Sequence, residues 1–201
     1  TEINRFTILQ IMTWSRIASL ATIAFLCLCR PLPAAERVQI VYGVDAPPIE
    51  QHAAKELGEQ FKRLFENVET EVVASPQPHP GTTVFVGSPA TNRNIARLFV
   101  NWPAVSDQGI VIQSIPEHQI YAVGGGSPPA TLWAAYELGH RLGIRYLPRG
   151  DMYPLEKKPF SLAGTDTVME PQLRSRTWRT INDFAIGPES WGIDEQRSHL
   201  R

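Results

Sequence analysis

A glycine- and proline-rich run in the second half of the chain constrains the fold more than any other stretch. The β-prone residues 120–123 lead into glycines at 124–126, and glycine adopts backbone angles that other residues avoid. Ser127 suits a helix N-cap, and the two prolines after it fit a first helical turn, where a missing N–H costs little. Apolar residues then recur at helical spacing up to Leu142, and Gly143 is placed to end the helix. The run predicts a strand, a glycine turn, a helix and a short strand.

Strand-like and helix-like patterns alternate before and after this run. An apolar stripe predicts a helix that opens at Pro48, with Glu50 among the charged residues of its solvent face. A second, short helix is predicted at 91–99, and the two prolines of residues 151–166 suit a linker. Strands are predicted at 38–44, 69–73, 82–87, 108–115, 119–123 and 165–169, the fourth and fifth of them forming a hairpin. The fold class expected is α/β (α+β), a mixed β-sheet with helices packed against it.

The segment GGGSPPATLWAAYELGHRLGIRYLPRGDMYP, residues 124–154, also carries a family resemblance. It resembles the end of the accessory domain that precedes the catalytic barrel in α-glucuronidases of glycoside hydrolase family 67. A similar domain precedes the barrel of β-hexosaminidases. The likeness covers roughly residues 38–169. It implies an accessory domain at 36–170 and, at 171–201, the first β/α unit of a truncated (β/α)8 barrel.

The resemblance implies a secreted enzyme of polysaccharide degradation that removes glucuronic acid from xylan fragments. The substrate would reach the protein through the missing barrel, and this chain would be inactive alone. The rival hypothesis is a non-enzymatic carbohydrate-binding or interaction domain of an exported protein. A third, a nucleotide-binding α/β domain, is disfavoured because prolines 128 and 129 remove donors that a phosphate would use and the GxGxxG spacing fails.

Four residues after residue 171 are the candidates for contact with a substrate. Asn182 and Asp183 follow a predicted strand at 173–181, and barrel chemistry occurs at the C-terminal ends of strands. Trp178 would stack on a sugar face, and Arg176 would face a uronate carboxylate. The alternative is that the tryptophan packs between domains and the arginine is solvated or paired structurally.

The sequence assigns no catalytic residue, no metal ligand and no cofactor. A glycosidase needs a pair of carboxyl groups, and the resemblance places them on later barrel strands. Asp194 and Glu195 instead fit the start of a helix. None of the five histidines has HxxxH or HxH spacing. With a formal net charge of −1, the chain shows no sign of a nucleic-acid partner.

The N-terminal residues 1–35 are typical of a secretory signal. Residues 17–29 form an apolar run that is too short to span a bilayer comfortably, and small residues follow it. Both cysteines, Cys27 and Cys29, lie in this run, so the mature chain would have none. Export to the periplasm or the medium is therefore expected, with no stable membrane span after cleavage; an uncleaved anchor or a buried helix is the alternative. Because the chain starts at Thr1 and stops inside a predicted helix, it is expected to be part of a longer protein.

Removal of residues 1–35 is the first testable prediction. N-terminal sequencing of the secreted protein should begin near Glu36, because the small residues Ala34 and Ala35 precede it. An intact N-terminus recovered from the membrane fraction would contradict cleavage.

Overall fold

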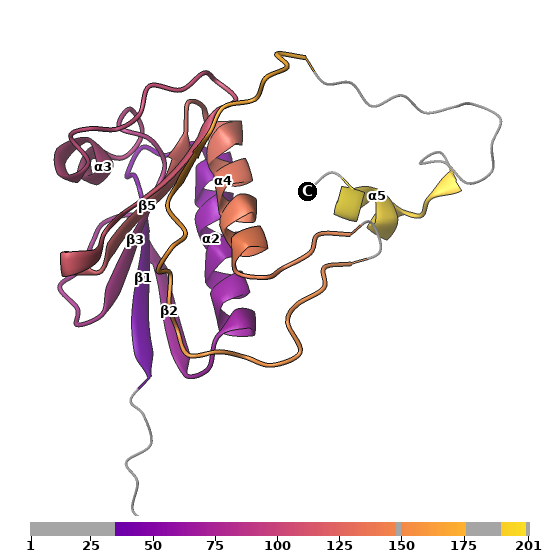
Figure 1. The fold of residues 1–201 in the computed structure, drawn as a ribbon, viewed down its shortest axis with the longest axis horizontal. Coiled ribbons are helices and arrows are strands. Elements are labelled where there is room, and N and C mark those ends of the chain that lie inside the picture. Colours follow the sequence, from indigo (N-terminus) through magenta and orange to yellow (C-terminus); the bar gives the residue numbers. More distant parts are fainter. Residues whose placement is uncertain (1–34, 148–149, 176–189, 200–201) are drawn as a thin grey trace, which may run out of the picture. The chain divides into compact units, whose positions relative to one another are not determined.

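Among the residues that the computed structural model describes, 35–147, 150–175 and 190–199, six strands form one mixed sheet (Figure 1). The strands are β1 Glu36–Tyr42, β2 Val68–Val73, β3 Thr82–Val86, β4 Ile110–Ile115, β5 Ile120–Gly125 and β6 Thr167–Met169. Their order is β2-β1-β3-β5-β4-β6. The first four in this order are parallel, and β4 is antiparallel to both β5 and β6. The short 3-10 helix η1, Pro116–His118, joins β4 to β5, so the predicted hairpin is confirmed.

Helices cover both faces of the sheet. Helices α2 (Pro48–Leu64) and α4 (Pro128–Arg141) lie on one face, and α3 (Arg93–Leu98) lies on the other (Figure 1). Successive residues of a strand point to opposite faces, so Ile40 joins the core under α2 and α4 while Val41 joins the smaller core under α3. Burial on both faces explains the continuous apolar strands, and the predicted α/β class is confirmed.

The predicted helix starts and stops are largely confirmed. Helix α2 opens with Pro48, and α4 follows Ser127, whose Oγ accepts a hydrogen bond from the N–H of Ala130 at 3.3 Å. Gly143 has a φ of +111° just after α4, a conformation that favours glycine. Near the end of the chain, helix α5 runs from Ile193 to His199 and so begins one residue before Asp194.

The predicted order of strand, turn and helix is confirmed, but the turn is shorter than the predicted 124–126, and its glycines do not adopt unusual backbone angles. Strand β5 continues through Gly125, and none of the three glycines has a positive φ. These positions need glycine because neighbouring backbones pass very close to them. A side-chain carbon on Gly124 would lie 1.6 Å from the carbonyl oxygen of Gly87, and one on Gly126 would lie 1.9 Å from that of Ser106. The glycines permit close packing of strand and loop backbones.

Three other expectations need correction. Strand β1 ends at Tyr42, two residues before the predicted end, because the chain turns at 44–45. The short strand after α4 is only a single β-bridge between Arg145 and Met152. Residues 151–166 are irregular, as predicted, yet they do not form a free linker, since Leu162 is buried in the core with α2.

Glu50 is the largest departure from the sequence pattern. The prediction placed it on the solvent face of α2, but its exposed fraction is 0%. It lies in the first turn of the helix, where the loop after β3 and the start of α4 cover it; its carboxylate accepts hydrogen bonds from Thr91 and Thr131. Contacts from distant segments therefore override the helical periodicity at this position.

Replacing Gly124 by alanine should destabilise the chain strongly. The added carbon would overlap the carbonyl of Gly87, and strand β5 cannot move away without breaking its pairing with β3, so we expect a loss of more than about 3 kcal/mol in the free energy of unfolding. Urea unfolding, monitored by circular dichroism, measures this loss.

Gly164→Ala is the matched control for this substitution. Nothing lies within 4 Å of a side-chain carbon at Gly164, and only its φ of +75° is unfavourable. The control should cost about 1–2 kcal/mol. Equal losses in the two variants would contradict the explanation by close approach.

Candidate functional site

The four residues predicted to contact a substrate, Arg176, Trp178, Asn182 and Asp183, lie outside the described residues. Their role therefore stays a prediction. The described part of the chain offers a different candidate site, which the sequence did not single out.

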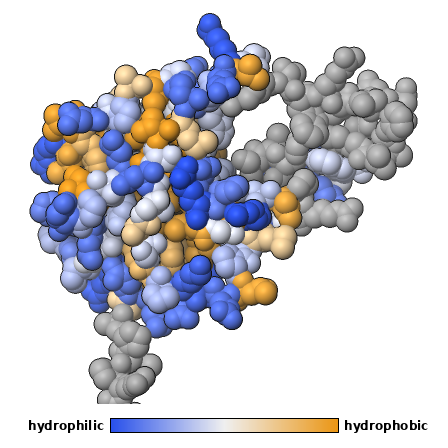
Figure 2. All heavy atoms as spheres, viewed as in Figure 1, coloured by the Kyte–Doolittle hydropathy of each residue, from blue (hydrophilic) through white to orange (hydrophobic). Residues whose placement is uncertain are grey.

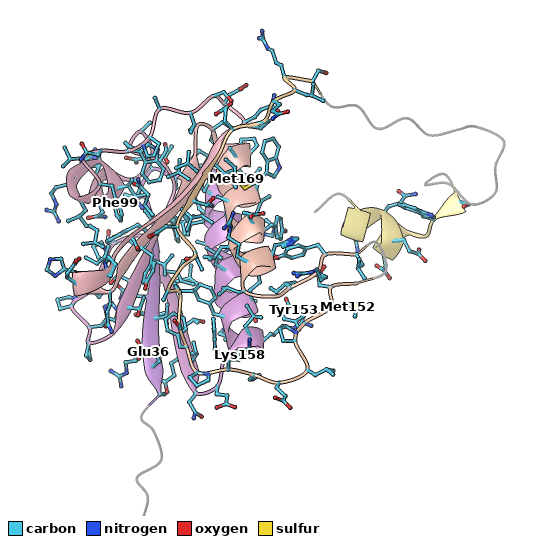
Figure 3. The ribbon with its side chains drawn as sticks, viewed as in Figure 1. Glu36, Phe99, Met152, Tyr153, Lys158 and Met169 are labelled. Atoms are coloured by element: carbon cyan, nitrogen blue, oxygen red, sulfur yellow. The ribbon has the colours of Figure 1, made fainter. Side chains whose placement is uncertain are left out.

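A groove of about 480 Å³ runs beside α4, and we call it the α4 groove. Its walls come from α4, from Gln108 and the start of β4, from Tyr146, and from the end of β6 with the two residues after it. The lining side chains include Trp133, Tyr136, Glu137, His140, Tyr146 and Met169. Figure 3 shows Met169 beside α4, and Arg141 of that helix donates to its sulfur at 3.9 Å. Apolar residues also reach the surface at several places on the face drawn in Figure 2.

The floor of the α4 groove is aromatic. The rings of Tyr136 and Tyr146 meet edge to face, with centroids 5.0 Å apart and planes at 73°. Burial, followed by the influence of Tyr153 and Asp151, raises the pKa of Tyr146 above its usual value, so its hydroxyl stays neutral at ordinary pH. Trp133 stands at the rim with 41% of its surface exposed. The groove thus offers a largely uncharged, apolar floor.

The two carboxylates of the groove are engaged in structural contacts. Glu137 accepts a hydrogen bond from Nε of Arg141 at 2.8 Å, and the same guanidinium donates to Oγ1 of Thr167 at 3.0 Å. Glu170 accepts from the N–H of Ser106 at 2.9 Å, and hydrogen bonds from Ser106 lower the pKa of Glu170. Both carboxylates thus hold neighbouring segments of the chain in place.

The carboxyl edge of the sheet, meaning the loops that follow β1, β3 and β5, is closed. Open α/β sheets bind ligands there, where the connections switch from one face to the other, and here that place is between β1 and β3. The side-chain amide of Asn92 fills it by donating to the carbonyls of Val41 and Val86, both at 3.0 Å. A side-chain carbon on Gly43 would lie 1.8 Å from the carbonyl oxygen of Thr91. These contacts bring the loops after β1 and β3 together.

The start of α4 is likewise bonded within the protein. The N–H of Gly126 donates to the carbonyl of Gly109 at 3.0 Å, and the N–H of Thr131 donates to that of Ser127 at 3.0 Å. The hydroxyl of Ser127 donates to the carbonyl of Asp107. The glycine-rich segment is therefore a structural junction, as the sequence favoured, rather than a phosphate loop.

Within the described ranges, no three His, Cys, Asp or Glu side chains come together in a way that could hold a metal ion. In the same ranges, no helix has the length and apolar character needed to cross a membrane.

Sequence reasoning missed the α4 groove because its walls come from separate segments. One signal was available: Trp133, Glu137 and His140 are spaced i, i+4 and i+7, which puts a tryptophan and two polar groups on one face of a helix. Met169 and Glu170 are brought to this face only by the pairing of β6 with β4.

No family model and no curated protein matches the sequence. Among solved structures, the chain is similar to BtGH115A, a family GH115 4-O-methyl-α-glucuronidase with specificity for decorated arabinogalactans, with a TM-score of 0.46 and 15% identity over 57% of this chain and 14% of that one. It is also similar to CpGH84D, with a TM-score of 0.39 and 11% identity over 54% of this chain and 18% of that one. Both are glycoside hydrolases, and this chain spans less than a fifth of either. At this level the likeness concerns the course of the chain and indicates no activity.

Asn92→Ala tests the closure of the carboxyl edge. It removes the donors to the carbonyls of Val41 and Val86 and also the cap that accepts from the N–H of Asn94, so we expect a loss of about 2–4 kcal/mol in unfolding free energy. Asn101→Ala, at an exposed position, should change stability by less than about 0.5 kcal/mol. Similar losses in both variants, measured by urea unfolding, would show that Asn92 does not hold this edge.

Proposed function

We propose that residues 36–170 form a non-catalytic accessory domain of a secreted, carbohydrate-active glycoside hydrolase of the α-glucuronidase type. We further propose that the α4 groove receives the catalytic part of that protein. The sequence resemblance at 124–154 supports the first statement. The observation that carries the second is that the chain leaves the sheet along an apolar groove.

The route of the chain supports this assignment. Glu170 and Pro171 follow β6 and line the groove directly. Further on, the carbonyl of Arg174 accepts a hydrogen bond from the side-chain amide of Gln108 at 2.6 Å, which holds the chain near the groove rim. The barrel unit proposed at 171–201 would therefore start beside the groove.

The side chains of the groove suit a protein partner. Trp133 and Met169 are 41% and 44% exposed, and tryptophan and methionine are enriched in protein interfaces. The carboxylates of Glu137 and Glu170 already have hydrogen-bond partners. In this proposal the groove supports the barrel structurally, and the barrel carries the catalytic residues.

The alternative function is a carbohydrate-binding domain, and one observation favours it. Trp133 presents part of its ring at the rim, and Glu137 and His140 follow on the same helix face. A flat aromatic surface beside polar groups is an arrangement that suits the face of a sugar ring. The same residues would thus suit either a protein domain or a carbohydrate, and substitution of Trp133 distinguishes these two hypotheses.

The decisive experiment compares this chain with a longer product, the protein in which a complete barrel follows it, as the proposal requires. Trp133→Glu should lower the melting temperature of the longer product by about 4 °C or more and leave that of the 201-residue chain nearly unchanged, because only the longer product buries the side chain. Val100→Glu is the control, at an 83% exposed position beside α3, and should change neither.

Two results would contradict the docking role. One is an equal response of the two products to Trp133→Glu. The other is calorimetric binding of xylan-derived oligosaccharides to the 201-residue chain that is lost in Trp133→Ala, and this result would establish the alternative.

The 201-residue chain should not hydrolyse aldouronic acids or aryl glycosides. A barrel builds its carboxyl pair from loops after several strands, and the sequence predicts one such strand here. Turnover that disappears in Asp183→Asn would place the active site in this chain and overturn the assignment as an accessory domain.

A further inference from the structure

Glu50 joins three segments at the carboxyl edge of the sheet. It lies in the first turn of α2, with an exposed fraction of 0%. Its Oε1 accepts a hydrogen bond from Oγ1 of Thr91 at 3.1 Å, in the loop after β3, and another from Oγ1 of Thr131 at 3.2 Å, in the first turns of α4. Three backbone segments therefore meet at one carboxyl oxygen.

The second oxygen of the same carboxyl group, Oε2, is buried. It has no hydrogen-bond partner among the described residues, and a side-chain carbon on Gly87 would lie 3.3 Å from it. A buried carboxylate with an unsatisfied oxygen and no cation is costly, whereas the protonated group carries no charge to desolvate.

From the surrounding elements, the described groups that hydrogen-bond to Glu50 are the hydroxyls of Thr91 and Thr131. Those elements also carry Asp45 before α2, His52, Lys55 and Glu56 on α2, Arg93 on α3 and Asp107 before α4. All of these are exposed except Glu56, which is half-buried and lies 3.8 Å from His52. Burial raises the pKa of Glu50, and the hydrogen bonds from Thr91 and Thr131 lower it by less.

We propose that the Glu50 carboxyl group is a proton-dependent clasp between α2, the 87–92 loop and the start of α4. With its proton, the carboxyl holds these segments together; without it, the carboxyl edge loosens. The pKa of Glu50 is higher in the folded than in the unfolded chain, so the stabilisation is fully present at acid pH and is lost as the pH rises through the folded value. Because α4 begins at this edge, loosening reaches the helix that carries the α4 groove.

The test measures amide hydrogen exchange and the carboxyl carbon signal of Glu50 in the full 201-residue chain. Protection factors of the amides of Asn92 and Thr131 should fall about tenfold as the pH rises above the ordinary titration range of glutamate, in step with the titration of Glu50. Glu50→Gln, which is neutral at every pH, should abolish this fall. Glu59→Gln is the matched control on the same helix, since Glu59 is 69% exposed, and it should keep the wild-type response.

A Glu50 signal that titrates in the ordinary range of glutamate would overturn the clasp, and so would a Glu50→Gln chain that keeps the wild-type pH response. Thr131→Val provides a second route if Glu50→Gln does not fold. It keeps the side-chain volume and removes one donor to the ionised carboxylate, so the fall in protection should move to higher pH. An unchanged midpoint in Thr131→Val would equally refute the proposal.

Discussion

The close approach of backbones at the carboxyl edge of the sheet is the constraint on which the rest of the structure depends. Glycines lie where loops cross strands, as at Gly43 beside Thr91 and at Gly124 beside Gly87. Asn92 then joins the ends of β1 and β3 through two carbonyls. The backbone contacts at the glycines leave no space for a side chain, and the side-chain amide of Asn92 ties the two parallel strands together at that edge.

This closure decides where the domain can interact. In an open α/β sheet the carboxyl edge is the usual ligand site, but here it is filled by Asn92 and by the buried carboxyl of Glu50. The α4 groove lies instead along the outside of α4. This groove lacks a free pair of carboxyl groups and is bounded by the segment through which the chain leaves the sheet. These features support the proposal that the groove receives a neighbouring domain.

Local signals predicted the elements well and their surroundings poorly. Proline at 48 and serine at 127 marked the helix starts because capping is a property of a few adjacent residues. Glu50 was misplaced because its partners are 41 and 81 residues away, and helical periodicity carries no information about them. The glycines at 124–126 were recognised as special, but a sequence does not distinguish an unusual φ from a close neighbour. The α4 groove was not predicted because four separate segments build it, and the sequence does not show that they lie together.

The groove itself depends on packing at the opposite end of the sheet. Phe160, in the irregular segment before β6, meets the rings of Phe65 and Phe61 at 4.9 and 5.7 Å. The guanidinium of Arg63 lies 3.6 Å from the ring centre of Tyr153, which anchors the same segment to α2. These contacts fix the path on which the chain returns to pair as β6 beside β4, and that pairing delivers Met169 to the groove. The aromatic cluster under α2 and the groove beside α4 are therefore two ends of one packed segment, and loss of the first would remove a wall of the second.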